Sequence, residues 1–135
     1  MRPIKILAAD DDPGMLEFYK ALLSEAGYQV ETAAEATAAI MLFKRSPADL
    51  LILDVAMPSG GGGQVFDIVR GLIQKGVPVI FVTGLPEKVS SLVPTRSNVL
   101  VFRKPMDCAV LLKEIPRLLV ESGVQMFWYM GNPVI

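Results

Sequence analysis

The chain has 135 residues, a formal net charge of −1, no histidine and one cysteine, Cys108. This composition excludes a histidine base, a phosphohistidine, a histidine metal ligand, an internal disulfide and a zinc site built from several cysteines. The small net charge predicts no general attraction to nucleic acid, and no apolar run is long enough to span a bilayer. We therefore expect one cytoplasmic domain that contacts neither nucleic acid nor membrane.

The first predicted strand, residues 4–9, is a short apolar run that ends in three acids, Asp10, Asp11 and Asp12. Adjacent carboxylates repel one another unless a cation lies among them. A site made only of oxygen ligands favours a hard cation such as Mg²⁺. The acids could instead form a turn that caps the next helix. This stretch alone does not decide between the two interpretations.

The first half of the chain alternates between helical and extended patterns. Asp12 and Pro13 predict the start of a helix that ends near Gly27. A strand is expected over 28–32 and a helix over 33–45, with Ile40, Met41 and Phe43 as core contacts. A second apolar strand, 49–53, ends in Asp54.

The glycine run at 60–63 lacks the lysine and hydroxyl residue of a phosphate-binding loop, and we interpret it as a flexible connection. A helix follows over 64–75, whose apolar positions predict an inner side made of Val65, Phe66, Ile68, Val69, Leu72 and Ile73.

Two further strands complete the pattern. Residues 77–82 form an apolar strand that ends at Thr83, and residues 98–102 lead into Lys104. Between them, Pro86 and Pro94 leave room for only a short helix centred on 89–92. A last helix, capped by Asp107, is expected through residue 121, with a kink at Pro116.

Five alternations of strand and helix predict a doubly wound α/β fold with a five-stranded parallel sheet. In such a sheet, ligands bind beyond the carboxyl ends of the strands. The polar residues that follow strands one, three, four and five all lie at that end. They are Asp10, Asp11, Asp12, Asp54, Thr83 and Lys104.

This combination of groups is typical of phosphoryl transfer. Asp54 could attack phosphorus and form an acyl phosphate, while a magnesium ion would neutralise the crowded carboxylates. Thr83 offers a hydroxyl donor and Lys104 a positive charge for the remaining phosphoryl oxygens.

The same residues resemble the receiver domains of two-component response regulators. The resemblance is carried by Asp10 and Asp11, Asp54 with Met57-Pro58, Thr83-Gly84, and Lys104-Pro105. It implies a flavodoxin-like (βα)5 fold with strand order 2-1-3-4-5. It also implies a receiver domain over residues 1–122, leaving 123–135 as an apolar tail or the start of an output region or linker.

The resemblance further implies a role for each site residue. Asp54 would take a phosphoryl group from a histidine kinase or phosphotransfer protein, with Thr83 and Lys104 as catalytic partners. Mg²⁺ would be bound directly by Asp11, Asp54 and the backbone carbonyl of Ala56, and by Asp10 through water. The Lys104–Pro105 bond would be cis. Such a chain is a signalling switch and not an enzyme, since its only chemistry is its own phosphorylation and dephosphorylation.

Three features depart from the family pattern. Val101 occupies the position usually held by an aromatic switch residue, and Phe102 lies on the opposite strand face by alternation. Neither Ala56 nor Leu85 can position a water, which predicts slow self-dephosphorylation. The apolar tail suggests an interface, so a homodimer could form through it or through the face made by the fourth helix, fifth strand and fifth helix.

Three other functions are known for α/β folds of this kind or for these residues. A pseudo-receiver that only binds proteins is supported by Val101, the short fourth helix and the tail. A phosphatase of the haloacid dehalogenase kind would need a second Asp where Ala56 stands. A flavodoxin-like flavin binder would need a phosphate-binding loop where the three acids lie.

Overall fold

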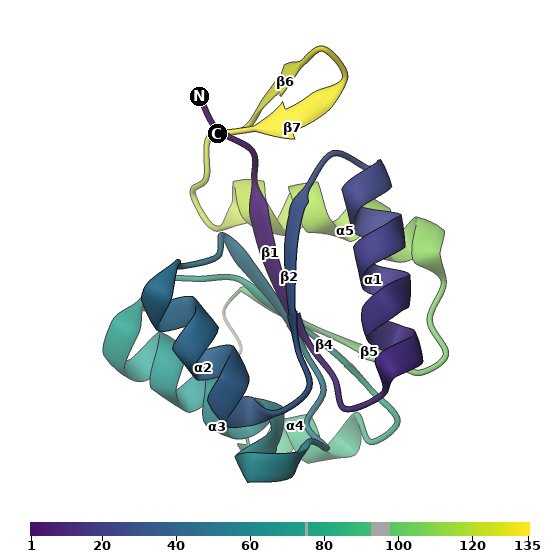
Figure 1. Cartoon of the computed structure of the whole chain (residues 1–135), viewed down its shortest axis with the longest axis vertical. Coiled ribbons are helices and arrows are strands. Elements are labelled where there is room, and N and C mark those ends of the chain that lie inside the picture. The colour runs from purple at the N-terminus through teal and green to yellow at the C-terminus, as the bar shows by residue number, and fades with distance from the viewer. Residues whose placement is uncertain (75, 93–97) are drawn as a thin grey trace.

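A five-stranded parallel sheet with the order β2-β1-β3-β4-β5 forms the centre of the molecule (Figure 1). The structure is a computed structural model that describes residues 1–74, 76–92 and 98–135. The strands are β1 (Lys5–Ala9), β2 (Gln29–Ala33), β3 (Leu50–Leu53), β4 (Val79–Thr83) and β5 (Val99–Arg103). The predicted flavodoxin-like fold and strand order are confirmed.

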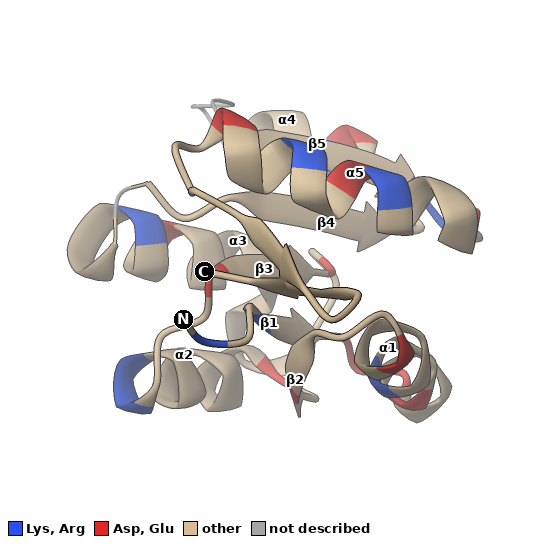
Figure 2. Ribbon diagram, turned by 90° about the horizontal axis from the view of Figure 1, so that it is seen from above, with Lys and Arg blue, Asp and Glu red and all other residues tan. Residues whose placement is uncertain are grey.

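Helices cover both faces of the sheet (Figures 1 and 2). On one face, α1 (Pro13–Glu25) and α5 (Cys108–Glu121) pack on the strands through residues such as Tyr19 and Ile115. On the other, α2 (Ala36–Arg45) and α3 (Gly61–Ile68) pack through residues such as Phe43. Strands buried on both faces explain why the sequence shows continuous apolar runs and not alternation.

The glycine run does not form a flexible connection, which corrects our prediction. A short 3₁₀ turn, Pro58–Gly60, leads directly into α3, and residues 61–63 lie buried in its first turn. A Cβ atom added to Gly62 would overlap the carbonyl oxygen of Asp54, and one added to Gly61 would overlap that of Val55. The glycines therefore allow α3 to pack directly against the backbone around Asp54.

The inner side predicted for this helix is correct only in its first half. Val65 and Phe66 are buried, but Leu72 and Ile73 are exposed. They lie in a π-helical turn, Val69–Ile73, that continues α3. The wider turn changes the angular spacing of side chains, so these two no longer follow the buried stripe. The predicted end of the helix at Lys75 lies outside the described residues.

Other helices differ in smaller ways. Met41 is exposed on α2, although Ile40 and Phe43 are buried as expected. Helix α4 (Glu87–Leu92) is short, as predicted, and Pro94 lies outside the described residues. Pro116 lies within α5, and the helix continues past it to Glu121, while the kink expected there stays a prediction.

The C-terminal tail forms a hairpin of two short strands, β6 (Phe127–Tyr129) and β7 (Asn132–Val134). Figure 1 shows it beyond the end of the sheet where β1 begins. Within the described ranges, no helix has the length and apolar character needed to cross a membrane. The boundary at residue 122 between a domain and a tail stays a prediction.

Candidate functional site

Three carboxylates meet at the carboxyl end of the sheet. Strands β1 and β3 are neighbours in register, with Ala9 opposite Leu53, so Asp10 and Asp54 lie side by side. The Asp54 N–H donates to the Ala9 carbonyl at 3.1 Å. Carboxylate oxygens of Asp10, Asp11 and Asp54 all lie within 4.8 Å of one another. Asp10 and Asp54 are buried, whereas Asp11 is exposed.

Lys104 joins the two buried carboxylates. Its Nζ lies 2.6 Å from Asp10 Oδ2 and 2.7 Å from Asp54 Oδ2. The Lys104–Pro105 peptide bond is cis, as predicted. The Lys104 backbone N–H also donates to the Thr83 carbonyl at 2.9 Å, which holds the start of this loop against β4.

Backbone donors orient the other oxygen of each carboxylate. Asp10 Oδ1 accepts from the Asp12 N–H at 2.9 Å, and Asp54 Oδ1 accepts from the Ala56 N–H at 3.0 Å. Asp12 does not belong to this group of three carboxylates; its side chain accepts from the Gly14 N–H and caps α1. The helix cap predicted for this run is therefore formed by Asp12, while Asp10 and Asp11 lie in the carboxylate cluster and their binding of Mg²⁺ stays a prediction.

The protonation properties of the site follow from burial and pairing. Burial raises the pKa of Asp10, although the hydrogen bond from Lys104 opposes this shift. For Lys104, burial favours the neutral amine, but the hydrogen bonds to Asp10 and Asp54 outweigh that effect and raise its pKa. Lys104 is therefore held as a cation between two carboxylates.

The donor set fits a magnesium ion. Three carboxylates and one ammonium leave two negative charges in the cluster, which a divalent cation would balance. All three acidic ligands are oxygen donors, as Mg²⁺ prefers. Asp11 is exposed, so the cluster opens to water on one side, and Mg²⁺ usually retains several waters. The role predicted for the Ala56 carbonyl stays a prediction.

Thr83 lies at the same edge of the sheet, at the end of β4. It is fully buried, and its Oγ1 accepts from the Leu85 N–H at 3.1 Å. Accepting this bond leaves the hydroxyl proton free to be donated. The fold thus brings every side chain of the predicted site to one end of the sheet.

Residues 101 and 102 face opposite sides of β5, as alternation predicts. Val101 packs with the core beneath α2 and α3. Phe102 packs with the core beneath α1 and α5. Phe102 therefore does not take the place of the aromatic side chain missing at position 101.

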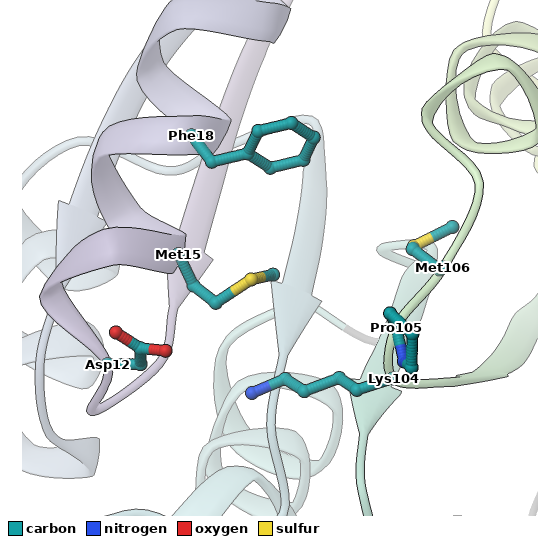
Figure 3. Close-up of a pocket in the computed structure, with 6 residues that line it drawn as sticks. All are labelled: Asp12, Met15, Phe18, Lys104, Pro105 and Met106. Carbon is teal, nitrogen blue, oxygen red and sulfur yellow. The ribbon is translucent and has the colours of Figure 1, made fainter.

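A pocket beside Lys104 was not foreseen from the sequence (Figure 3). It has a volume of about 370 Å³ and lies between the start of α1 and the loop before α5. The sequence signal was present, since Met15 and Phe18 are spaced by one helical turn and Met106 follows the Lys-Pro pair. The lining residues are Asp12, Met15, Phe18, Lys104, Pro105 and Met106.

Comparison with known sequences supports one family. Residues 6–115 match the model of the response regulator receiver domain. The transcriptional regulatory protein GlrR of Escherichia coli is 32% identical over 90% of this chain, and the matched region makes up 28% of the length of GlrR. Protein Rrf1 of Nitratidesulfovibrio vulgaris is 31% identical over 87% of this chain and 83% of its own length.

Solved structures give the same result. A CheY-like receiver domain protein of Methanospirillum hungatei has a TM-score of 0.82 at 27% identity, covering 90% of this chain and 97% of its own. The chemotaxis protein CheY4 of Vibrio cholerae has a TM-score of 0.75 at 30% identity, covering 86% and 98%. By contrast, the chain spans only about a quarter to a half of the length of the first curated relatives.

Proposed function

The chain belongs to the response regulator receiver family, and we propose that it accepts a phosphoryl group on Asp54 in the presence of Mg²⁺. The donor would be the phosphohistidine of a histidine kinase or phosphotransfer protein in the cytoplasm. The chain would act as a switch and not as an enzyme, because its chemistry would be limited to its own phosphorylation and dephosphorylation.

The reaction would form one bond and break one. An oxygen of the Asp54 carboxylate attacks phosphorus, the P–N bond to the imidazole breaks, and an acyl phosphate results. Mg²⁺ bound to the acidic cluster would neutralise charge on the carboxylates and the phosphoryl oxygens. The Lys104 ammonium and the Thr83 hydroxyl would bind the other phosphoryl oxygens.

The single observation that carries this proposal is the position of Lys104 between two buried carboxylates. The ammonium touches Asp54, the proposed acceptor, and Asp10, a proposed metal ligand, at 2.7 and 2.6 Å. A cation at this point would attract an incoming phosphate toward Asp54. Once Asp54 carries a phosphoryl group, Lys104 would move to the new charge, and the loop after β5 would move with it.

The test is incubation with acetyl phosphate, with and without Mg²⁺, followed by intact-mass measurement. We expect the mass of one phosphoryl group to be added only when Mg²⁺ is present. Asp54→Asn should abolish the adduct. Asp67→Asn makes the same chemical change on the exposed side of α3 and should leave it unchanged. Labelling of Asp54→Asn, or no labelling of the unmodified chain, would refute the proposal.

A pseudo-receiver that binds proteins without phosphorylation is the second candidate. It is favoured by Val101 at the switch position and by α4, which has only six residues. The acetyl phosphate experiment separates the two candidates, since a pseudo-receiver would gain no mass under any condition.

A further inference from the structure

The C-terminal hairpin displays three consecutive aromatic residues to solvent. Phe127, Trp128 and Tyr129 are 58%, 63% and 55% exposed. Residues 123–135 contain no charged residue, and Figure 2 shows the hairpin as an uncharged ribbon over one end of the sheet. The family model ends at residue 115, before this segment begins. An uncharged aromatic surface of this kind marks an interaction site or an aggregation liability.

The second strand of the hairpin fixes it to the body of the protein. Pro133 and Val134 of β7 are buried, and Val134 forms a β-bridge with Pro3. The backbones of Arg2 and Ile135 exchange two hydrogen bonds of 2.9 Å. A Cβ atom added to Gly27 would lie 2.6 Å from Asn132 Oδ1, so the α1–β2 turn packs closely on β7. Strand β7 is thus an anchor, and β6 is the displayed strand.

The register of the hairpin shows which backbone groups β6 leaves unpaired. Met130 and Gly131 have φ angles of 53° and 84°, the pattern of a two-residue type I′ turn. Tyr129 and Asn132 flank this turn as a hydrogen-bonded pair, so Trp128 and Pro133 form the next, non-hydrogen-bonded pair. The N–H and C=O of Trp128 therefore point away from β7. Within the described residues, no other strand pairs with β6 on that side.

We propose that β6 pairs with β6 of a second copy of this chain, antiparallel and centred on Trp128. In this register the two Trp128 residues exchange both hydrogen bonds, so the edge is complementary to itself, as a two-fold interface requires. Phe127 of each copy lies opposite Tyr129 of the other, and cross-strand aromatic pairs stabilise sheets. Proteins usually protect an exposed strand edge by keeping it short or by adding charges or proline; β6 is short, with three residues, but carries neither charge nor proline.

The exposed area fits a weak homodimer. Aromatic side chains bury about 150–250 Å² each when covered, and the three on β6 are 55–63% exposed. If all of this area were covered, two copies would bury roughly 700 Å² of aromatic surface, and Met130 with the strand backbones sets an upper limit near 1,000 Å², where specific interfaces begin. The dissociation constant should therefore lie in the micromolar range.

The proposed interface lies at the other end of β1 from the acidic site. Pro3 contacts the hairpin and Asp10 belongs to the carboxylate cluster, and the five residues of β1 between them span about 16 Å. The dimer therefore leaves Asp54 accessible. Its dissociation constant should be the same for the unmodified chain and for Asp54→Asn, so this inference can fail or hold independently of the proposed phosphorylation.

Analytical ultracentrifugation of the full chain from about 1 to 300 µM tests the proposal. We expect the weight-average mass to rise toward twice that of the monomer. Trp128 is the only tryptophan, so its fluorescence should shift to shorter wavelength over the same range. Trp128→Lys places two ammonium groups together and should weaken dimerisation by about tenfold or more. Leu72→Lys adds the same charge at a residue that is 82% exposed in the π turn after α3 and should have no effect.

A disulfide test examines the register and does not depend on Trp128→Lys folding. In a Cys108→Ser background, Trp128→Cys places one thiol on each member of the hydrogen-bonded pair formed by position 128 of the two copies. The Cα atoms of such a pair lie about 5.5 Å apart, within disulfide range. Oxidation should give a covalent dimer, whereas Leu72→Cys in the same background should stay monomeric. A chain that remains monomeric at the highest concentration, or equal cross-linking of the two cysteine variants, would overturn the proposal.

Discussion

Replacing Lys104 by methionine tests whether this residue holds the acidic site together. The substitution keeps an unbranched chain of similar length but removes the ammonium that contacts Asp10 and Asp54. Two neighbouring buried carboxylates would then share no cation. We expect the variant to fold, to be less stable than the unmodified chain without Mg²⁺, and to recover part of that loss when Mg²⁺ is added.

The magnitude follows from the contacts. Lys104 makes two hydrogen bonds of 2.6 and 2.7 Å to acceptors whose side chains are 1% and 7% exposed. Removing one partner of a buried ion pair costs about 3–5 kcal/mol. The Lys104 side chain is itself 24% exposed, so solvent screens part of the interaction. We therefore expect the free energy of unfolding to fall by about 2–3 kcal/mol without Mg²⁺.

Urea denaturation with and without Mg²⁺ measures this effect. Mg²⁺ at about ten times its dissociation constant stabilises the folded state by about 1.4 kcal/mol. At the same Mg²⁺ concentration, the free energy of unfolding should rise more for the variant than for the unmodified chain, because no ammonium competes with the ion. Lys113→Met makes the same change at an exposed position on α5 and should shift stability by less than about 0.5 kcal/mol. An equal loss with and without Mg²⁺, or no loss at all, would refute the reasoning.

Three further predictions concern the loops around the site and the start of the sheet. Gly62→Ala should lower the free energy of unfolding in urea by about 1–3 kcal/mol and slow phosphorylation, because its Cβ would overlap the Asp54 carbonyl oxygen. Gly71→Ala is the control, since no atom lies within 4 Å of its added Cβ, and it should cause neither effect. Time-resolved intact-mass measurement should show slow loss of the phosphoryl group in excess Mg²⁺, and Ala56→Asn should accelerate that loss by offering a group that positions water; unchanged rates would argue against it. Arg2→Ala should lower the free energy of unfolding by at most about 1 kcal/mol, since Arg2 is half exposed. In urea denaturation, Asp49→Ala should lower the free energy of unfolding more than Arg2→Ala does, because Asp49 also accepts the backbone N–H of Lys5. The reverse order would contradict this.

The site was predictable because its residues directly follow apolar strands. In a parallel sheet, the end of each strand fixes which residues lie at the carboxyl edge, so Asp54, Thr83 and Lys104 could be placed together without coordinates. The different roles of Asp10 and Asp12 could also be predicted from their positions relative to the strand and to Pro13. A residue that precedes Pro13 suits an N-cap, and its carboxylate is then committed to the Gly14 N–H.

The missed features depend on contacts between segments distant in sequence or on local changes of helical period. The role of Gly62 depends on how closely α3 approaches the Asp54 carbonyl, which no local pattern encodes. Leu72 follows the apolar spacing of an α-helix, but a π turn moves it to solvent. The first error lies beside the site, at the start of α3, and the second lies at the other end of the same helical segment, where the period changes.

The tail shows how a composition argument can identify a surface without its structure. The apolar and aromatic character of the tail indicated an interface, but the strand pairing comes from the turn at Met130 and Gly131, whose positive φ angles suit a hairpin. Pro133 then acts in two ways. It packs on the α1–β2 turn, and its missing N–H suits the non-hydrogen-bonded pair with Trp128. Because β7 is held in this way, β6 presents a regular strand edge, and an ordered edge pairs with a partner at lower entropic cost than a disordered tail would.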